Sequence, residues 1–104
     1  MNEGNPTLRQ LLEACEALLR SVGEGFWAGR IAEVLGQNRE GEICNRGIEE
    51  VLSWYGGMGS FADLYISQVN GDLVGPEEER GVRQTLDDLR ERIYTAAAAQ
   101  KRPG

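Results

Sequence analysis

The spacing of apolar residues constrains the fold of this chain more than any other feature, because it repeats at about 100° per residue in four segments. The first segment begins at Pro6, with Asn5 as the expected N-cap. It ends at Gly23, a residue suited to a left-handed C-terminal cap. One apolar stripe along this segment predicts a surface helix with a single buried side.

The second segment runs from Gly25 to Gly36, and its inner face is made of four apolar residues. These are Trp27, Ile31, Val34 and Leu35. Neighbouring residues on a helix cannot share a face, so Phe26 points away from this stripe. Phe26 is therefore expected to cover the connecting turn, to reach a neighbouring helix, or to lie exposed as part of a binding surface.

The third segment carries two apolar lines between Ile43 and Tyr55. The main line consists of Cys44, Ile48, Val51, Leu52 and Tyr55, and the second of Ile43, Gly47 and Trp54. Two lines are typical of a helix that packs against two neighbours, and a glycine in one line permits close approach of another backbone. The alternative is an exposed second line, which would expose Trp54 as an interface residue or mediate a homodimer.

The fourth segment opens with Pro76 and three glutamates, which suit the positive end of a helix dipole. Apolar residues then follow at alternating steps of four and three, as in a short coiled coil. They are Val82, Leu86, Leu89, Ile93 and Ala96. On the polar side, Glu79 with Arg83 and Asp88 with Arg92 are spaced for ion pairs along the helix.

Together the segments predict an all-α, compact four-helix bundle that forms a single domain over residues 1–104, with flexible ends at 1–5 and 100–104. The segment between Gly56 and Gly75 joins the third and fourth helices. Its Asn70-Gly71 pair is a turn signal for one short β-hairpin, which would need support from the helices.

The glycine-rich start of this connection allows two interpretations. In the structural one, Gly56 and Gly57 end the third helix, Met58 and Phe61 turn back into the core, and Asp63 braces the next element. In the other, the segment binds an anion or small ligand, with Asp63 as a base if burial raises its pKa. That site would consist of Gly56, Gly57, Gly59, Ser60 and Asp63.

The run from Gly56 to Leu64, Gly-Gly-Met-Gly-Ser-Phe-Ala-Asp-Leu, resembles the central motif of a family of small, single-domain bacterial proteins of unknown function. Gly-Gly-Met-Gly-Ser-Phe-Asn-Asp-Leu is typical of that family, so Ala62 stands where asparagine is usual. The Phe26-Trp27 pair, the stretch 48–55 and the helix 77–94 look like its other landmarks. The resemblance implies one domain and supplies no activity.

Charge and composition exclude several classes of function. The net charge of -6 disfavours nucleic acid as a partner, and no apolar run is long enough to cross a membrane. Because the chain contains no histidine, it has neither a Ser-His-Asp catalytic triad nor an imidazole-ligated metal site, and no cofactor is expected.

The first residues lack the features of a secretory signal, which favours the cytoplasm. Cys15 and Cys44 are either two buried thiols or one disulfide.

These features favour a non-catalytic protein-binding module. The concrete hypothesis is a bacterial immunity-type protein, whose acidic surface occludes the basic active cleft of a toxin. The residues expected to contact the partner surround the third helix. They are Glu40, Glu42, Glu49, Glu50, Trp54 and Tyr55.

Overall fold

The computed structural model describes residues 6–37, 43–55, 61, 75 and 77–100. Within these residues the chain forms helices only: α1 (Leu8–Ser21), α2 (Gly25–Gln37), α3 (Asn45–Ser53) and α4 (Glu79–Gln100). The prediction of an all-α four-helix bundle is therefore confirmed. The predicted hairpin lies outside the described residues.

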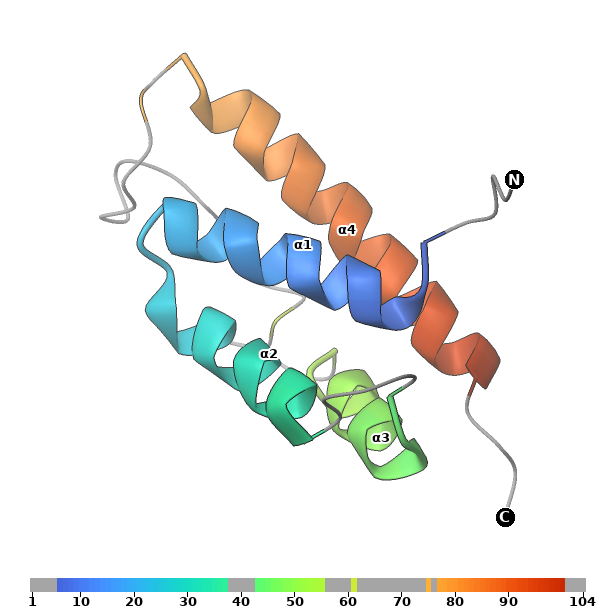
Figure 1. Ribbon diagram of the computed structural model, residues 1–104. Coiled ribbons are helices and arrows are strands. Elements are labelled where there is room, and N and C mark those ends of the chain that lie inside the picture. The colour runs from blue at the N-terminus through green and yellow to red at the C-terminus, as the bar shows by residue number, and fades with distance from the viewer. Residues whose placement is uncertain (1–5, 38–42, 56–60, 62–74, 76, 101–104) are drawn as a thin grey trace, which may run out of the picture.

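Helix α1 is the centre of the arrangement. It packs against α2 on one side and against α4 on the other, while α3 contacts α4 and α2 (Figure 1). Helices α1 and α4 run in opposite directions, so the start of α1 lies near the end of α4 (Figure 1). No described helix is both long enough and apolar enough to span a membrane.

Local interactions set both ends of α1. The N-cap is Thr7 rather than the predicted Asn5, because the Thr7 hydroxyl accepts a hydrogen bond from the Gln10 amide at 3.1 Å and the Gln10 side chain accepts one from the Thr7 amide at 2.9 Å. At the other end, Gly23 has a φ of 81°, and the Glu24 amide donates to the Leu19 carbonyl at 2.8 Å. This is the expected left-handed glycine cap, and it turns the chain into α2.

The apolar stripes meet in one core, as their spacing predicts. Residues that are 0% exposed come from every helix, including Leu12, Ile31, Val51 and Ile93. On α4, Leu86 and Ile93 are buried as expected, whereas Ala97 rather than Ala96 completes the buried line. The predicted pairs of Glu79 with Arg83 and Asp88 with Arg92 are present, at 3.1 and 3.2 Å.

The two cysteines have different environments. Cys15 is buried on α1, whereas Cys44 is exposed and serves as the N-cap of α3. Neither cysteine forms a disulfide, so the disulfide alternative is wrong, and so is the expectation that Cys44 is buried. The apolar stripe of α3 starts one turn later than the sequence suggested, because the chain is still extended at Cys44.

Candidate functional site

An aromatic cluster joins α2, α3 and α4 and includes one residue of the glycine-rich connection. Its members are Phe26, Trp27, Trp54, Tyr55, Phe61 and Tyr94. Each ring lies within 5.9 Å of the next, measured between centroids, and most pairs meet edge to face. This is the favoured arrangement for aromatic pairs. The cluster is buried at its centre and reaches the surface at Phe26 and Tyr94, which are 66% and 47% exposed.

Phe61 is the hub of the aromatic cluster. Its side chain is 0% exposed, and its ring contacts Trp27, Trp54 and Tyr55 at 5.2–5.9 Å. Its amide donates to the Trp54 carbonyl at 2.9 Å, and its carbonyl accepts from the Arg90 guanidinium at 2.8 Å. The prediction that Phe61 turns back into the core is therefore confirmed.

Arg90 links this hub to α4. Its guanidinium lies 6.0 Å from the centroid of the Phe61 ring and forms an ion pair with Asp87. The Tyr55 hydroxyl donates to the Arg90 carbonyl at 2.7 Å, so both ends of this arginine residue are engaged. Burial raises the pKa of the Tyr55 phenol well above its ordinary value. The hydrogen bonds of the Tyr55 hydroxyl, the Phe61 carbonyl and Arg90 are partly buried, and such a network makes this part of the site rigid.

A second polar link joins α2 to α3 through Glu50. One carboxylate oxygen, Oε2, accepts from the Arg30 guanidinium at 2.9 Å and from the Trp54 indole N–H at 3.0 Å. The hydrogen bond from Trp54, together with the bond and charge of Arg30, lowers the pKa of the Glu50 carboxyl against the opposing effect of desolvation. Glu50 therefore remains ionised at neutral pH and connects the two helices.

Arg30 extends this link to the exposed end of the aromatic cluster. The carbon of its guanidinium lies 5.8 Å from the centroid of the Phe26 ring and 5.5 Å from that of Trp27. Phe26 also meets Trp27 edge to face at 5.3 Å. Of the alternatives open for Phe26, the structure selects exposure, with the ring supported on two sides by its own helix.

The residues expected to contact a partner fall into different environments. Glu49 is exposed and Glu50 is partly exposed, as a contact surface requires. Trp54 is only 2% exposed, so it cannot be the aromatic anchor in this fold. Tyr55 is partly buried and its hydroxyl is used within the chain.

The remaining site predictions meet two different outcomes. The line of Ile43, Gly47 and Trp54 is buried within the chain, so it offers no surface for a homodimer. Glu40 and Glu42 lie outside the described residues. So do all the residues of the alternative ligand site, namely Gly56, Gly57, Gly59, Ser60 and Asp63.

None of the three alternatives that the sequence left open for Phe26 included its contact with Arg30. The signal was available, because Arg30 follows Phe26 by four residues and Trp27 by three, the spacings at which helical side chains meet. The tie from Glu50 to Trp54 also has a four-residue spacing, but its partner across the helices, Arg30, depends on the tertiary fold.

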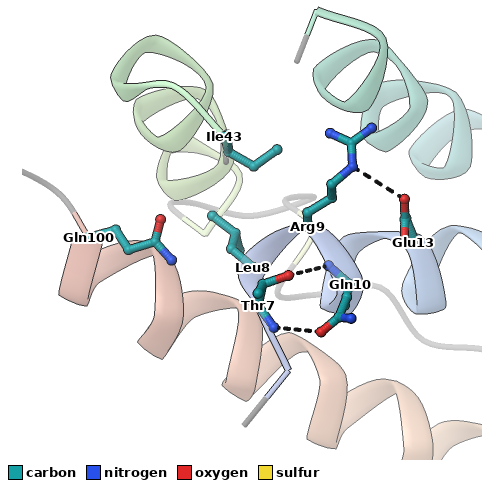
Figure 2. A pocket seen from close by; sticks show the side chains of 7 residues that line it. All are labelled: Thr7, Leu8, Arg9, Gln10, Glu13, Ile43 and Gln100. Atoms are coloured by element: carbon teal, nitrogen blue, oxygen red, sulfur yellow. Dashed lines mark hydrogen bonds and ion pairs between the residues drawn. The ribbon is translucent and has the colours of Figure 1, made fainter. Parts of the chain in front are cut away.

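A hollow of about 230 Å³ lies between α2 and α3, beside the Arg30–Glu50 pair. It is lined by Glu33, Val34, Gln37, Arg46 and Glu50. Another, of about 450 Å³, lies at the start of α1, where Leu8, Ile43 and Gln100 converge (Figure 2). There the Thr7–Gln10 capping bonds and the Arg9–Glu13 ion pair at 3.4 Å already use polar groups of the wall (Figure 2). In the described part of the chain, no three Cys, Asp or Glu residues group as metal ligands would.

Comparison with known proteins places the chain in a family. Residues 20–75 match the model described as Domain of unknown function (DUF6966), which is more than half of the chain. The chain belongs to this family. The DUF6966 match includes α2, α3 and Phe61, and hence most of the aromatic cluster. No curated protein and no solved structure matches the chain.

Proposed function

We propose that this DUF6966 protein is a non-catalytic, protein-binding module of bacterial cytoplasm, an immunity-type protein that occludes the basic active cleft of a toxin. One observation carries the proposal: the charges of the described residues are divided unevenly between internal pairs and free surface. Most arginines of this part of the chain are held by carboxylates, whereas several glutamates are not held by arginines.

The paired arginines lie on three helices. Arg9, Arg20, Arg30, Arg83, Arg90 and Arg92 each lie within salt-bridge distance of a carboxylate. Within the described residues, the exposed Glu33, Glu49, Glu77 and Glu91 have no such partner. Of the described arginines, the exposed Arg46 and Arg80 form none of these ion pairs, and the four glutamates outnumber them. The balance of unpaired charge on this surface is therefore negative, in keeping with the net charge of -6 of the whole chain.

An outward negative potential favours a partner with a positive surface. Charges of this kind contribute little to affinity at the rim of an interface, but they accelerate encounter with a partner of opposite sign. A toxin that acts on a nucleotide or nucleic acid has a basic cleft because its substrate is anionic. A small acidic domain that binds over such a cleft blocks the substrate without any chemistry of its own.

The proposal is tested by co-expression with a toxin encoded beside this protein in its own genome. The wild-type protein should restore growth to cells that produce the toxin. The proposal fails if no neighbouring gene encodes a toxin, or if the toxin kills equally well with and without the protein.

The role of charge is tested on the purified pair by stopped-flow measurement of the association rate constant. Replacing Glu33, Glu49, Glu77 and Glu91 with glutamine should slow association by about tenfold at low salt and much less at high salt. Arg46→Gln is the matched control, because Arg46 is exposed, forms no ion pair within the described residues, and carries the opposite charge. It should speed association slightly; equal slowing by both variants would contradict steering.

A further inference from the structure

Phe26 is the most exposed large hydrophobic side chain of the described residues, at 66% of its surface. It lies in the first turn of α2, and in the view of Figure 1 this helix lies on the side of α1 away from α4. Arg30 and Glu33 follow it by four and seven residues, so the three side chains share one side of the helix. Single exposed apolar residues are common, and the exposure of Phe26 alone would decide nothing.

The support of the Phe26 ring distinguishes it from an ordinary exposed residue. Trp27 meets the Phe26 ring edge to face, the Arg30 guanidinium lies over the Phe26 ring, and Glu50 of the neighbouring helix forms an ion pair with Arg30. The same Glu50 oxygen is fixed by the indole N–H of the buried Trp54. The Phe26 ring is therefore held in place by Trp27 and Arg30, and Arg30 is connected through Glu50 to the buried Trp54. A side chain that is already fixed loses less conformational entropy on binding.

The charges next to the ring also suit the centre of an interface. The Arg30 charge is cancelled by Glu50, whose side chain is 43% exposed, so burial of the ring and its support does not remove an unpaired charge from water. Interface centres are poor in unpaired charge and rich in aromatic and arginine side chains, with polar residues at the rim. Here Glu33, Gln37 and Arg46, which line the hollow between α2 and α3, would supply the polar residues of the rim.

We propose that Phe26, Arg30 and Glu33 of α2 and Glu50 of α3 form the docking surface of this protein, and that its occupant is a protein of net positive charge that offers an apolar socket to the Phe26 ring. Because Glu50 pairs with Arg30 and Glu33 has no such partner among the described residues, this surface carries a net negative charge, as does the whole chain at -6; complementarity therefore favours an occupant of positive charge. Phe26 is the contact residue, while Arg30 and Glu50 are positioning residues. This inference rests on the proposed function, and it assigns the surface that function would use.

The support can be tested on the free protein, because Phe26 and Phe61 are the only phenylalanines. Labelling phenylalanine with ¹³C gives two sets of ring signals in the NMR spectrum, one from the surface and one from the core. Arg30→Gln should move the Phe26 ring signals and leave those of Phe61 in place, whereas a loss of structure would move both. Unchanged Phe26 signals would show that Arg30 does not position the ring.

Docking is tested by replacing Phe26 with the photoreactive p-benzoyl-phenylalanine and irradiating cells that produce the neighbouring toxin. Tyr94 is the matched control, since it is the other exposed aromatic residue and belongs to the far end of the aromatic cluster. The toxin should crosslink at position 26 and not at position 94. With purified proteins, Phe26→Ser should weaken binding by about tenfold or more and Tyr94→Ser by less than about twofold.

The outcomes separate this inference from the proposed function. If the toxin binds and protection is unaffected by Phe26→Ser, the docking surface is wrong although the function holds. If position 26 crosslinks a basic protein that is not a toxin, and Phe26→Ser weakens binding of that protein, the surface holds and the proposed function fails. Crosslinks from position 26 to a second copy of the chain, or equal crosslinks at both positions, overturn the surface.

Discussion

Phe61 offers the sharpest test of how this fold is held together. Replacing it with alanine removes a ring that is 0% exposed and that contacts Trp27, Trp54 and Tyr55. The Phe61 amide that donates to the Trp54 carbonyl and the Phe61 carbonyl that accepts from Arg90 belong to the backbone, so both hydrogen bonds are chemically available in the variant. The substitution therefore isolates the contribution of the side chain.

The expected cost is large relative to the stability of a domain of this size. Truncation of a buried phenylalanine to alanine lowers the free energy of unfolding by about 3–5 kcal/mol. Lost edge-to-face pairs, each of about 0.5–1.5 kcal/mol, favour the upper part of that range. Small domains have a total stability of about 5–15 kcal/mol, so Phe61→Ala is expected to bring the protein near its unfolding limit.

Urea unfolding followed by far-UV circular dichroism measures this change. Fluorescence is unsuitable as the only probe, because both tryptophans touch the substituted ring. With an m-value of about 2 kcal/mol/M, the midpoint should fall by about 2 M urea. Phe61→Leu keeps part of the apolar volume and should lose about 1–2 kcal/mol, which gives a measurable variant even if the alanine variant is unfolded.

Phe26→Ala is the matched control, because it removes the same side chain from an exposed position. Its free energy of unfolding should stay within about 0.5 kcal/mol of the wild type. The reasoning is refuted if Phe61→Ala costs less than about 1 kcal/mol, or if the two alanine variants are equally destabilised.

Three further predictions concern charge, thiols and glycines. The pKa of Glu50 is lowered below its ordinary 4.5, so the ionised carboxylate stabilises the fold above that pH. Glu50→Gln should therefore lower the free energy of unfolding, measured with urea, at neutral pH. This loss should shrink as the pH falls through the lowered pKa. Burial raises the pKa of the Cys15 thiol to about 12, so Ellman's reagent should react with Cys44 alone in the folded protein and with both thiols in denaturant. Gly23→Ala should lower the free energy of unfolding, measured by thermal denaturation, by about 1–2 kcal/mol because of the positive φ. Gly29→Ala should raise it by about 0.5–1 kcal/mol, because alanine favours a helix more than glycine does and the added Cβ meets no neighbouring element within 4 Å.

Each of these predictions has a contradicting result. A Glu50→Gln effect that does not depend on pH would mean that the carboxylate charge is not what stabilises the fold. Rapid reaction of two thiols in the folded protein would contradict the burial of Cys15. Equal effects of Gly23→Ala and Gly29→Ala would contradict the left-handed cap.

The helices and their buried faces could be predicted from the sequence because apolar periodicity is a local property. The cap at Gly23 and the return of Phe61 to the core followed from the same local rules. The N-cap was misplaced because Asn5 and Thr7 are both good caps, and only the reciprocal Thr7–Gln10 bonds decide between them. A threonine followed three residues later by glutamine was the sequence signal for this choice.

The candidate site could not be predicted as a whole because it depends on which helix covers which face. Trp54 is buried because Trp27 of α2 and Phe61 pack against it, and no local pattern specifies those partners. Glu50 is partly exposed, and its hydrogen bond from Arg30 depends on the packing of α3 beside α2, which the sequence does not specify. Phe26 is exposed because adjacent residues cannot both face inward, and the inward place is taken by Trp27.

The most direct test of the account is a titration of toxin activity with the purified protein. An occluding partner acts by occupying the cleft, so activity should fall in proportion to the protein added and reach its minimum at one equivalent. Complete loss of activity with far less than one equivalent would mean that each molecule inactivates many toxin molecules. That result would contradict binding without catalysis.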